Sequence, residues 1–77
     1  MHNNLLPIPP EDDLLIRAAD VPKYVGIARQ TMSRWRHEGV GPRFIRLGRR
    51  VFYRSSDLRK WIDAQVRENT IVGEDDV

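Results

Sequence analysis

The fold of this chain can be inferred from one central run of residues, Gly26-Ile27-Ala28-Arg29-Gln30-Thr31-Met32-Ser33-Arg34-Trp35-Arg36-His37-Glu38. Its spacing predicts a tight turn followed by one amphipathic helix, because Met32 and Trp35 lie three residues apart and form a narrow apolar stripe. Gly39 follows directly, and glycine commonly ends a helix in the left-handed conformation. The stretch therefore predicts a helix that packs through one narrow face.

The polar face of this helix contains few of the Lys and Glu residues that usually make a helix soluble. It holds Arg29, Gln30, Ser33, Arg34 and His37. Arg, Gln and Ser have the donor and acceptor geometry to contact base edges in a DNA major groove. Two interpretations stay open at this point: a recognition helix, and a solvent-facing helix that happens to be basic.

The length and composition narrow the class of protein. A chain of 77 residues predicts one domain with a small core. The absence of cysteine excludes a disulfide scaffold and thiolate zinc sites, and it fits a reducing cytoplasm. His2 and His37 are too few for an independent metal site or a catalytic dyad. No apolar run approaches the roughly 20 residues of a membrane span, and the N-terminus lacks a signal-peptide pattern. We therefore expect no metal, no cofactor and no membrane segment.

The charge is distributed unevenly along the chain. Residues 14–54 carry ten Lys and Arg against two acidic residues, a net charge of +8, whereas residues 1–13 and residues 55–77 each carry −3. Nine of those ten cations are Arg, which suits bidentate contacts with phosphate and guanine better than Lys does. This clustering is typical of a protein that binds a polyanion. The alternative is a basic face covered by the acidic ends of the chain.

The segments before the central helix predict a flexible arm and a short first helix. Residues 1–13 contain three prolines and three acidic residues, so we expect an extended or disordered arm. The apolar run of residues 14–16 is expected to anchor the fold. Residues 17–25 predict a helix that starts late, with Asp20 as its N-cap, because Pro22 is tolerated only in the first turn. With Gly26 as its end, this helix and the next form a helix-turn-helix.

The segments after the central helix predict a hairpin and a last helix. Residues 43–47 and 51–54 are expected as strands around a three-residue loop, Gly48-Arg49-Arg50. This register places Leu47 opposite Val51 and Ile45 opposite Tyr53 on one face, and it leaves Phe44, Arg46, Phe52 and Arg54 on the other. Ser55 or Ser56 is expected to cap the last helix. We assign to the core Met32, Trp35, Leu47, Val51, Tyr53, Leu58, Trp61 and Ile62.

A hairpin that follows a helix-turn-helix is a wing, and its tip carries two adjacent arginines. Arg49 and Arg50 suit the phosphate backbone or a narrow minor groove. The prediction is thus an α+β fold, a winged helix-turn-helix of two short helices, a β-hairpin wing and a C-terminal helix, with disordered ends. Its domains are a flexible arm at 1–13, a DNA-binding domain at 14–67 and an acidic flexible tail at 68–77.

The motifs Tyr24-Val25-Gly26-Ile27, Trp35-Arg36, Gly41-Pro42-Arg43-Phe44, Leu47-Gly48-Arg49-Arg50-Val51, Tyr53-Arg54 and Trp61-Ile62 resemble a known family over residues 14–66. It is the family of small winged helix-turn-helix proteins that includes excisionases and AlpA-type prophage regulators, and it is similar in fold to the DNA-binding half of MerR-type regulators. Ala28 departs from the Ser or Thr common there, and Pro22 departs from a helix former.

The resemblance implies that the second helix enters a major groove while the wing contacts the adjacent minor groove or backbone. The predicted DNA-binding residues are Arg29, Gln30, Ser33, Arg34, His37, Arg46, Arg49 and Arg50. The predicted function is that of a non-enzymatic, cytoplasmic and nucleoid-associated protein that binds duplex DNA. Within the family we favour an excisionase, or recombination directionality factor, that bends attachment-site DNA for a site-specific integrase and associates with itself cooperatively on DNA. A small transcriptional regulator of a mobile element is the alternative.

Two further classes use the same residues differently. An RNA-binding module would need Phe44 and Phe52 exposed on one sheet face, and a protein-interaction adaptor would use the same pair as an apolar patch. An enzyme is not expected, because no nucleophile–base pair or carboxylate pair occurs in a suitable arrangement.

Overall fold

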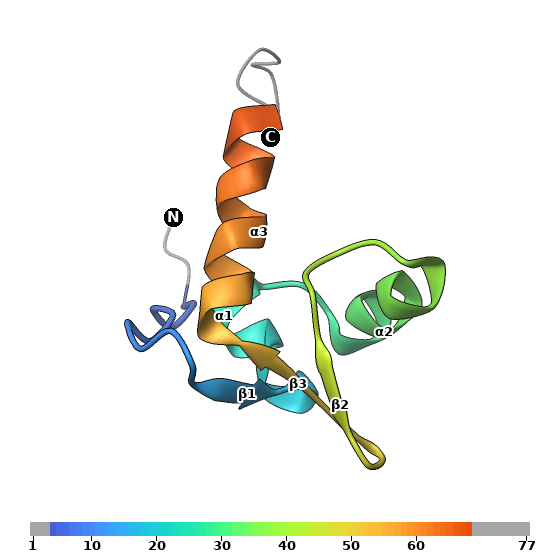
Figure 1. The fold of residues 1–77 in the computed structure, drawn as a ribbon. Helices are drawn as coiled ribbons and strands as arrows, with labels where there is room; N and C mark the ends of the chain where they lie inside the picture. Colours follow the sequence, from blue (N-terminus) through green and yellow to red (C-terminus); the bar gives the residue numbers. More distant parts are fainter. Residues whose placement is uncertain (1–3, 69–77) are drawn as a thin grey trace.

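The computed structural model describes residues 4–68 and has an α+β architecture. In chain order its elements are β1 (Leu15–Arg17), the 3-10 helix η1 (Ala18–Asp20), α1 (Pro22–Val25), α2 (Arg29–Glu38), β2 (Ile45–Leu47), β3 (Arg50–Arg54) and α3 (Ser55–Glu68). Figure 1 shows α3 rising from the end of β3, with α2 to one side of the β2–β3 hairpin. The predicted winged helix-turn-helix is confirmed, with one strand more than expected.

The additional strand is β1, which pairs antiparallel with β3 and gives the sheet the order β1-β3-β2. Ile16 lies opposite Tyr53, and both side chains are buried. Residues 14–16 therefore do anchor the fold, but as a strand that contributes one core side chain. Leu15 is 41% exposed, because the side chains of neighbouring strand residues point to opposite faces, and Leu14, which precedes the strand, is 43% exposed.

The predicted hairpin register is wrong by one residue. Leu47 lies opposite Arg50, so the loop is the two-residue turn Gly48-Arg49. Gly48 has φ +62°, as expected for the first position of a type II′ turn, whose twist matches that of the flanking strands. The apolar pairing on which the three-residue loop was based is therefore not formed.

The shifted register separates the two phenylalanines of the hairpin. The Phe44 ring lies 6.3 Å from the Tyr53 ring between centroids, on the core side of the sheet. Phe52 follows the outer face, where it pairs with Ile45 and Arg17. Leu47, which we assigned to the core, is 52% exposed. The RNA-binding and adaptor alternatives required both phenylalanines on one face, so they lose their basis.

The predicted first helix is shorter than expected and starts later. Residues 18–20 form η1, and α1 covers only residues 22–25, with Pro22 in its first turn. Asp20 is not the N-cap of α1, since that position is Val21 and no side chain caps it. Asp20 instead lies between Arg17 at 2.8 Å and Lys23 at 3.3 Å. Proline at the start of the helix removes an N–H that a cap would otherwise satisfy.

The core lies between the sheet and the helices. Its buried apolar members are Ile16, Val21, Met32, Tyr53 and Leu58. Trp35 and Trp61 flank this core and are partly exposed, whereas Val66 at the far end of α3 is 59% exposed. Among the residues placed by the structure, no helix is long and apolar enough to cross a membrane.

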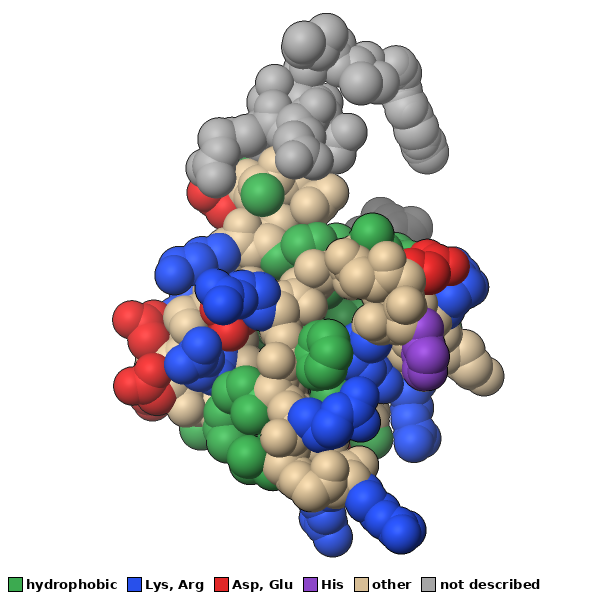
Figure 2. Space-filling model, turned by 45° about the vertical axis from the view of Figure 1, so that its right-hand side comes forward, with side chains coloured by type: hydrophobic (Ala, Val, Ile, Leu, Met, Phe, Trp, Pro, Cys, Tyr) green, Lys and Arg blue, Asp and Glu red, His purple; other side chains and the backbone are tan. Residues whose placement is uncertain are grey.

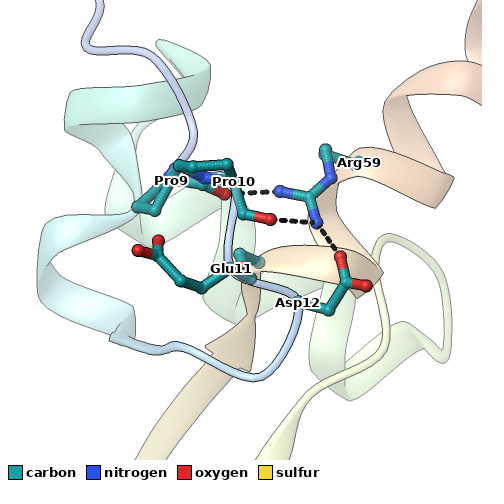
Figure 3. A network of polar contacts seen from close by, with 6 residues as sticks. Pro9, Pro10, Glu11, Asp12 and Arg59 are labelled. Carbon is teal, nitrogen blue, oxygen red and sulfur yellow. Dashed lines mark hydrogen bonds and ion pairs between the residues drawn. The ribbon is translucent and has the colours of Figure 1, made fainter.

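The Pro-rich N-terminal segment lies against α3 and α1 (Figure 3). The Arg59 guanidinium donates to the backbone oxygens of Pro9 and Pro10 and contacts the Asp12 carboxylate. Ser55 is the first residue of α3, and its hydroxyl donates to the Glu11 carbonyl. Residues 4–14 form no helix or strand.

The division into a flexible arm at 1–13, a DNA-binding domain at 14–67 and a flexible tail at 68–77 remains a prediction. The contacts of residues 9–12 with α3 were not foreseen for a flexible arm. The acidic tail predicted at residues 68–77 lies outside the described residues except for its first.

Candidate nucleic-acid interface

Helix α2 is held to the domain by one face, and this leaves the predicted contact face free. Met32 is 1% exposed, and the indole of Trp35 lies 5.6 Å from that of Trp61 on α3. Gly39 ends the helix with φ +76°, as predicted. Ala28 provides no side-chain cap at its start. The opposite face carries exposed Arg29, Gln30, Arg34 and His37, with Ser33 partly exposed among them.

The turn between α1 and α2 is supported by the N-terminal segment. Gly26 ends α1 with φ +73°, and a Cβ placed on it would lie 3.3 Å from Leu5. The Leu6 N–H donates to the Lys23 carbonyl at 2.8 Å. These contacts fix the helix-turn-helix from outside the predicted domain limits.

A groove of about 320 Å³ separates α2 from the wing, and its charged lining is entirely cationic. Its lining consists of Arg17, Ala18, Ala19, Arg29, Arg36, Arg49, Arg50, Val51 and Phe52. Arg29 also lines a neighbouring hollow on α2 with Gln30 and Ser33. The fold thus brings together three of the predicted contact residues, Arg29, Arg49 and Arg50, with two arginines that were not predicted.

The wing tip projects away from the helices. Arg49 and Arg50 are both exposed, and Figure 2 shows Lys and Arg side chains extending from the lower end of the molecule, where Figure 1 places the wing. Arg50 closes the two-residue turn opposite Leu47, whereas Arg49 lies within it. The two side chains therefore leave the hairpin from different positions.

Five predicted residues lie outside the groove: Gln30 and Ser33 line the neighbouring hollow, and Arg34, His37 and Arg46 line neither. Arg34 on α2 lies 3.7 Å from Glu38, between Nε and Oε2. The His37 Nδ1 lies 3.0 Å from the Ser33 backbone oxygen, one helical turn earlier. Arg46 lies on the core side of the sheet, where its guanidinium carbon is 5.9 Å from the Phe44 ring centroid. The observed register therefore places Arg46 on the opposite sheet face from the one that we predicted, beside the Phe44 ring that Arg36 also approaches.

Sequence reasoning missed Arg17 and Arg36 as members of the groove. Arg17 is the last residue of the unpredicted strand β1 and lies opposite Phe52, so its place beside the wing could not be foreseen. Arg36 lies next to Trp35 on the packed side of α2, and the sequence motif that contains it had assigned it no role. Its position one turn after buried Met32 was the available signal, because residues four apart share a helix face.

At the margin of the groove, the ion pair between Arg17 and Asp20 shifts the pKa of both side chains. Asp20 accepts a hydrogen bond from Arg17, and this bond lowers the pKa of the Asp20 carboxyl, with Lys23 adding to the effect and desolvation opposing it. The same bond raises the pKa of Arg17. Within the described range, no group of three His, Cys, Asp or Glu side chains could hold a metal ion.

Comparison with known proteins gives one match. Residues 15–66 match the family model of a helix-turn-helix domain, which covers more than half of the chain. No curated protein matches the chain. No solved structure matches it either.

Proposed function

Since the chain belongs to the helix-turn-helix domain family and such a domain binds DNA, we propose that it recognises a specific duplex sequence as an excisionase. In this role it binds and bends attachment-site DNA, so that a site-specific integrase excises a mobile element. It makes and breaks no bonds itself.

The observation that carries this proposal is the cationic groove between α2 and the wing. A duplex that places its major groove against Gln30 and Arg34 would bring its backbone past Arg29 toward the wing. Phosphate contacts then fix the register, and the side chains on the exposed face of α2 read the bases. The arrangement serves one short site, so one copy gives limited specificity.

Cooperative self-association supplies the remaining specificity. Glu11 and Asp13 are exposed on the N-terminal segment, away from the Arg-lined groove. An acidic surface of one copy facing the basic surface of the next is a heterologous contact, and such a contact builds a row rather than a closed dimer. A curved row on directly repeated sites bends the DNA, as excision requires.

Footprinting on the DNA that flanks its own gene tests the role. Protection within an attachment site, together with excision that depends on this protein in the presence of integrase, supports the excisionase. Protection over a promoter, with no effect on excision, replaces it with a transcriptional regulator of the element.

Gel shifts on an array of repeats test the assembly. We expect successive bands, bending in a circular-permutation assay, and weaker binding once the array is reduced to one site. Equal affinity for an isolated site on straight DNA would remove both the row and the main reason to prefer the excisionase.

A further inference from the structure

We propose that Arg36, aligned by Tyr53, is the fixed cation of a site for one backbone phosphodiester of duplex DNA, in the groove between α2 and the wing. The inference rests on the DNA binding proposed above. It assigns a contact to a residue that neither the helix pattern nor the wing pattern had indicated.

The Arg36 guanidinium is held in place by the sheet. Its Nη1 donates to the Tyr53 hydroxyl at 2.8 Å. Its carbon lies 5.9 Å from the Tyr53 ring centroid and 5.8 Å from that of Phe44, within the range of cation–π attraction. Tyr53 is itself 1% exposed and is therefore a rigid acceptor. A long side chain that normally samples many rotamers is thus preorganised before a ligand arrives.

The charge of Arg36 is not compensated within the domain. No carboxylate among the described residues forms an ion pair with it, and neither Asp nor Glu lines the groove. By contrast, Arg17, Arg34, Arg54 and Arg59 each pair with a carboxylate. A partly buried guanidinium has lost some of its hydration, so it gains from an anion that accepts its remaining N–H groups.

The ligand chemistry follows from the shape and the neighbours of the site. A guanidinium fork matches two oxygens of a phosphate, and Arg29, Arg49 and Arg50 surround the same groove. Because Arg36 comes from α2 and Tyr53 from β3, the site couples the recognition helix to the wing. A phosphodiester that passes between a major-groove helix and a minor-groove wing fits this position.

The first experiment measures affinity against salt concentration with a duplex selected from a random pool by the wild-type protein. Arg36→Met keeps the aliphatic stem and removes the charge. We expect affinity to fall about tenfold on selected and on random duplex alike, with the log–log slope less negative by about 0.9. Arg43→Met is the matched control, because Arg43 is exposed and lies outside the groove. Equal effects of the two variants would overturn the site.

A second variant separates alignment from charge. Tyr53→Phe keeps the ring and the core but removes the acceptor of Arg36. We expect the salt slope to stay unchanged while affinity falls about threefold. The Arg36 Nε–H signal in NMR should become averaged by faster rotation, and Tyr24→Phe should leave it unchanged. An unchanged Arg36 signal and affinity in Tyr53→Phe would contradict the alignment, even if Arg36→Met failed to fold.

Methylphosphonate substitution locates the phosphate. Replacing one phosphate at a time in the selected duplex removes one charge, and at a single position the wild-type protein should lose affinity while Arg36→Met loses none. Absence of such a position overturns the proposal. Inorganic phosphate at constant ionic strength should leave the Arg36 signal unshifted, whereas saturation by millimolar phosphate would make this a general anion site. If the wild-type protein binds no duplex, the proposed function itself fails.

Discussion

The indole rings of Trp35 on α2 and Trp61 on α3 lie 5.6 Å apart between centroids and are inclined by 50° to each other. This tilted contact is a favoured geometry for aromatic pairs. It joins α2 to the C-terminal helix α3, whose far end leaves the body of the domain. The orientation of α2 therefore depends on a residue that does not touch the proposed DNA surface.

Trp61→Ala should destabilise the domain and weaken DNA binding without changing its sequence preference. Because Trp61 is only partly buried, we expect a loss of about 2 kcal/mol in the free energy of unfolding, below the range for a fully buried Trp. Urea unfolding and gel shifts on selected and random duplex measure both effects. Lys60→Ala, at an exposed neighbour, is the control for stability. A preferential loss on the selected duplex would instead place Trp61 at the bases.

Two glycines near the end of α2 should differ in their tolerance of alanine. Gly39 and Gly41 have φ of +76° and +88°, so both substitutions strain the backbone by about 1 kcal/mol or more. A Cβ at Gly41 would also lie 3.1 Å from the Trp35 ring, whereas one at Gly39 meets nothing within 4 Å. We expect Gly41→Ala to lower the urea midpoint further than Gly39→Ala, with unchanged m-values. Equal midpoints would show that the Trp35 contact adjusts freely.

Stability should depend on pH through Asp20. Since the Arg17 hydrogen bond lowers the Asp20 pKa in the folded state, its contribution is present above the unfolded pKa. That contribution is lost as the pH falls through the lowered folded pKa. NMR titration of the Asp20 carboxyl should give a midpoint below its ordinary value, and Arg17→Ala should move this midpoint upward. A midpoint that Arg17→Ala leaves in place would assign the shift to another group.

The salt dependence of DNA binding should reflect the Arg-lined groove. Five arginines line it, and neutralising about as many phosphates predicts a log–log slope of roughly −4 to −5. Isothermal titrations between low and moderate salt give this slope directly. A slope near zero would exclude phosphate contacts as the basis of binding.

Base contacts and backbone contacts should separate by mutation. Arg34→Ala should cost about 1–3 kcal/mol on the selected duplex and relax the preference at one base pair, since Arg34 lies on the exposed face of α2. The double variant Arg49→Ala/Arg50→Ala should weaken selected and random duplex more evenly and reduce the salt slope. Equal losses on random DNA for Arg34→Ala would remove the support for α2 as the recognition helix.

The sequence predicts the elements that depend on local signals, and it does not predict those that depend on how strands pair. Met32, Trp35 and Gly39 define α2 correctly because helix periodicity and its glycine end are local signals. We chose the hairpin register from the apolar cross-strand pairs alone, whereas the observed two-residue turn begins at Gly48 with φ +62°. The strand at residues 15–17 is too short to show alternation, so only its pairing with β3 defines it.

The two surfaces of the candidate site could be predicted from the sequence, but the groove between them could not. The exposed face of α2 and the wing tip follow from spacing, and the structure places all of the predicted residues on the surface of α2 or the hairpin. The groove between them depends on tertiary placement. Arg36 could be assigned to the groove only once the Tyr53 hydroxyl was known to face α2. Arg46 was assigned to the wrong face of the sheet, because the predicted register was wrong by one residue.

The docking of residues 9–12 on α3 also sets an order of events during synthesis. The backbone oxygens that receive Arg59 come from residues 49 and 50 positions earlier in the chain. At roughly 5–20 residues per second, the ribosome makes these acceptors several seconds before their donor exists. The helix-turn-helix and then β3 are translated in that interval, after Leu5 and β1. The nascent chain can therefore complete its sheet only after β3 has been translated, and it can seat its N-terminal segment only after Arg59 of α3 has followed.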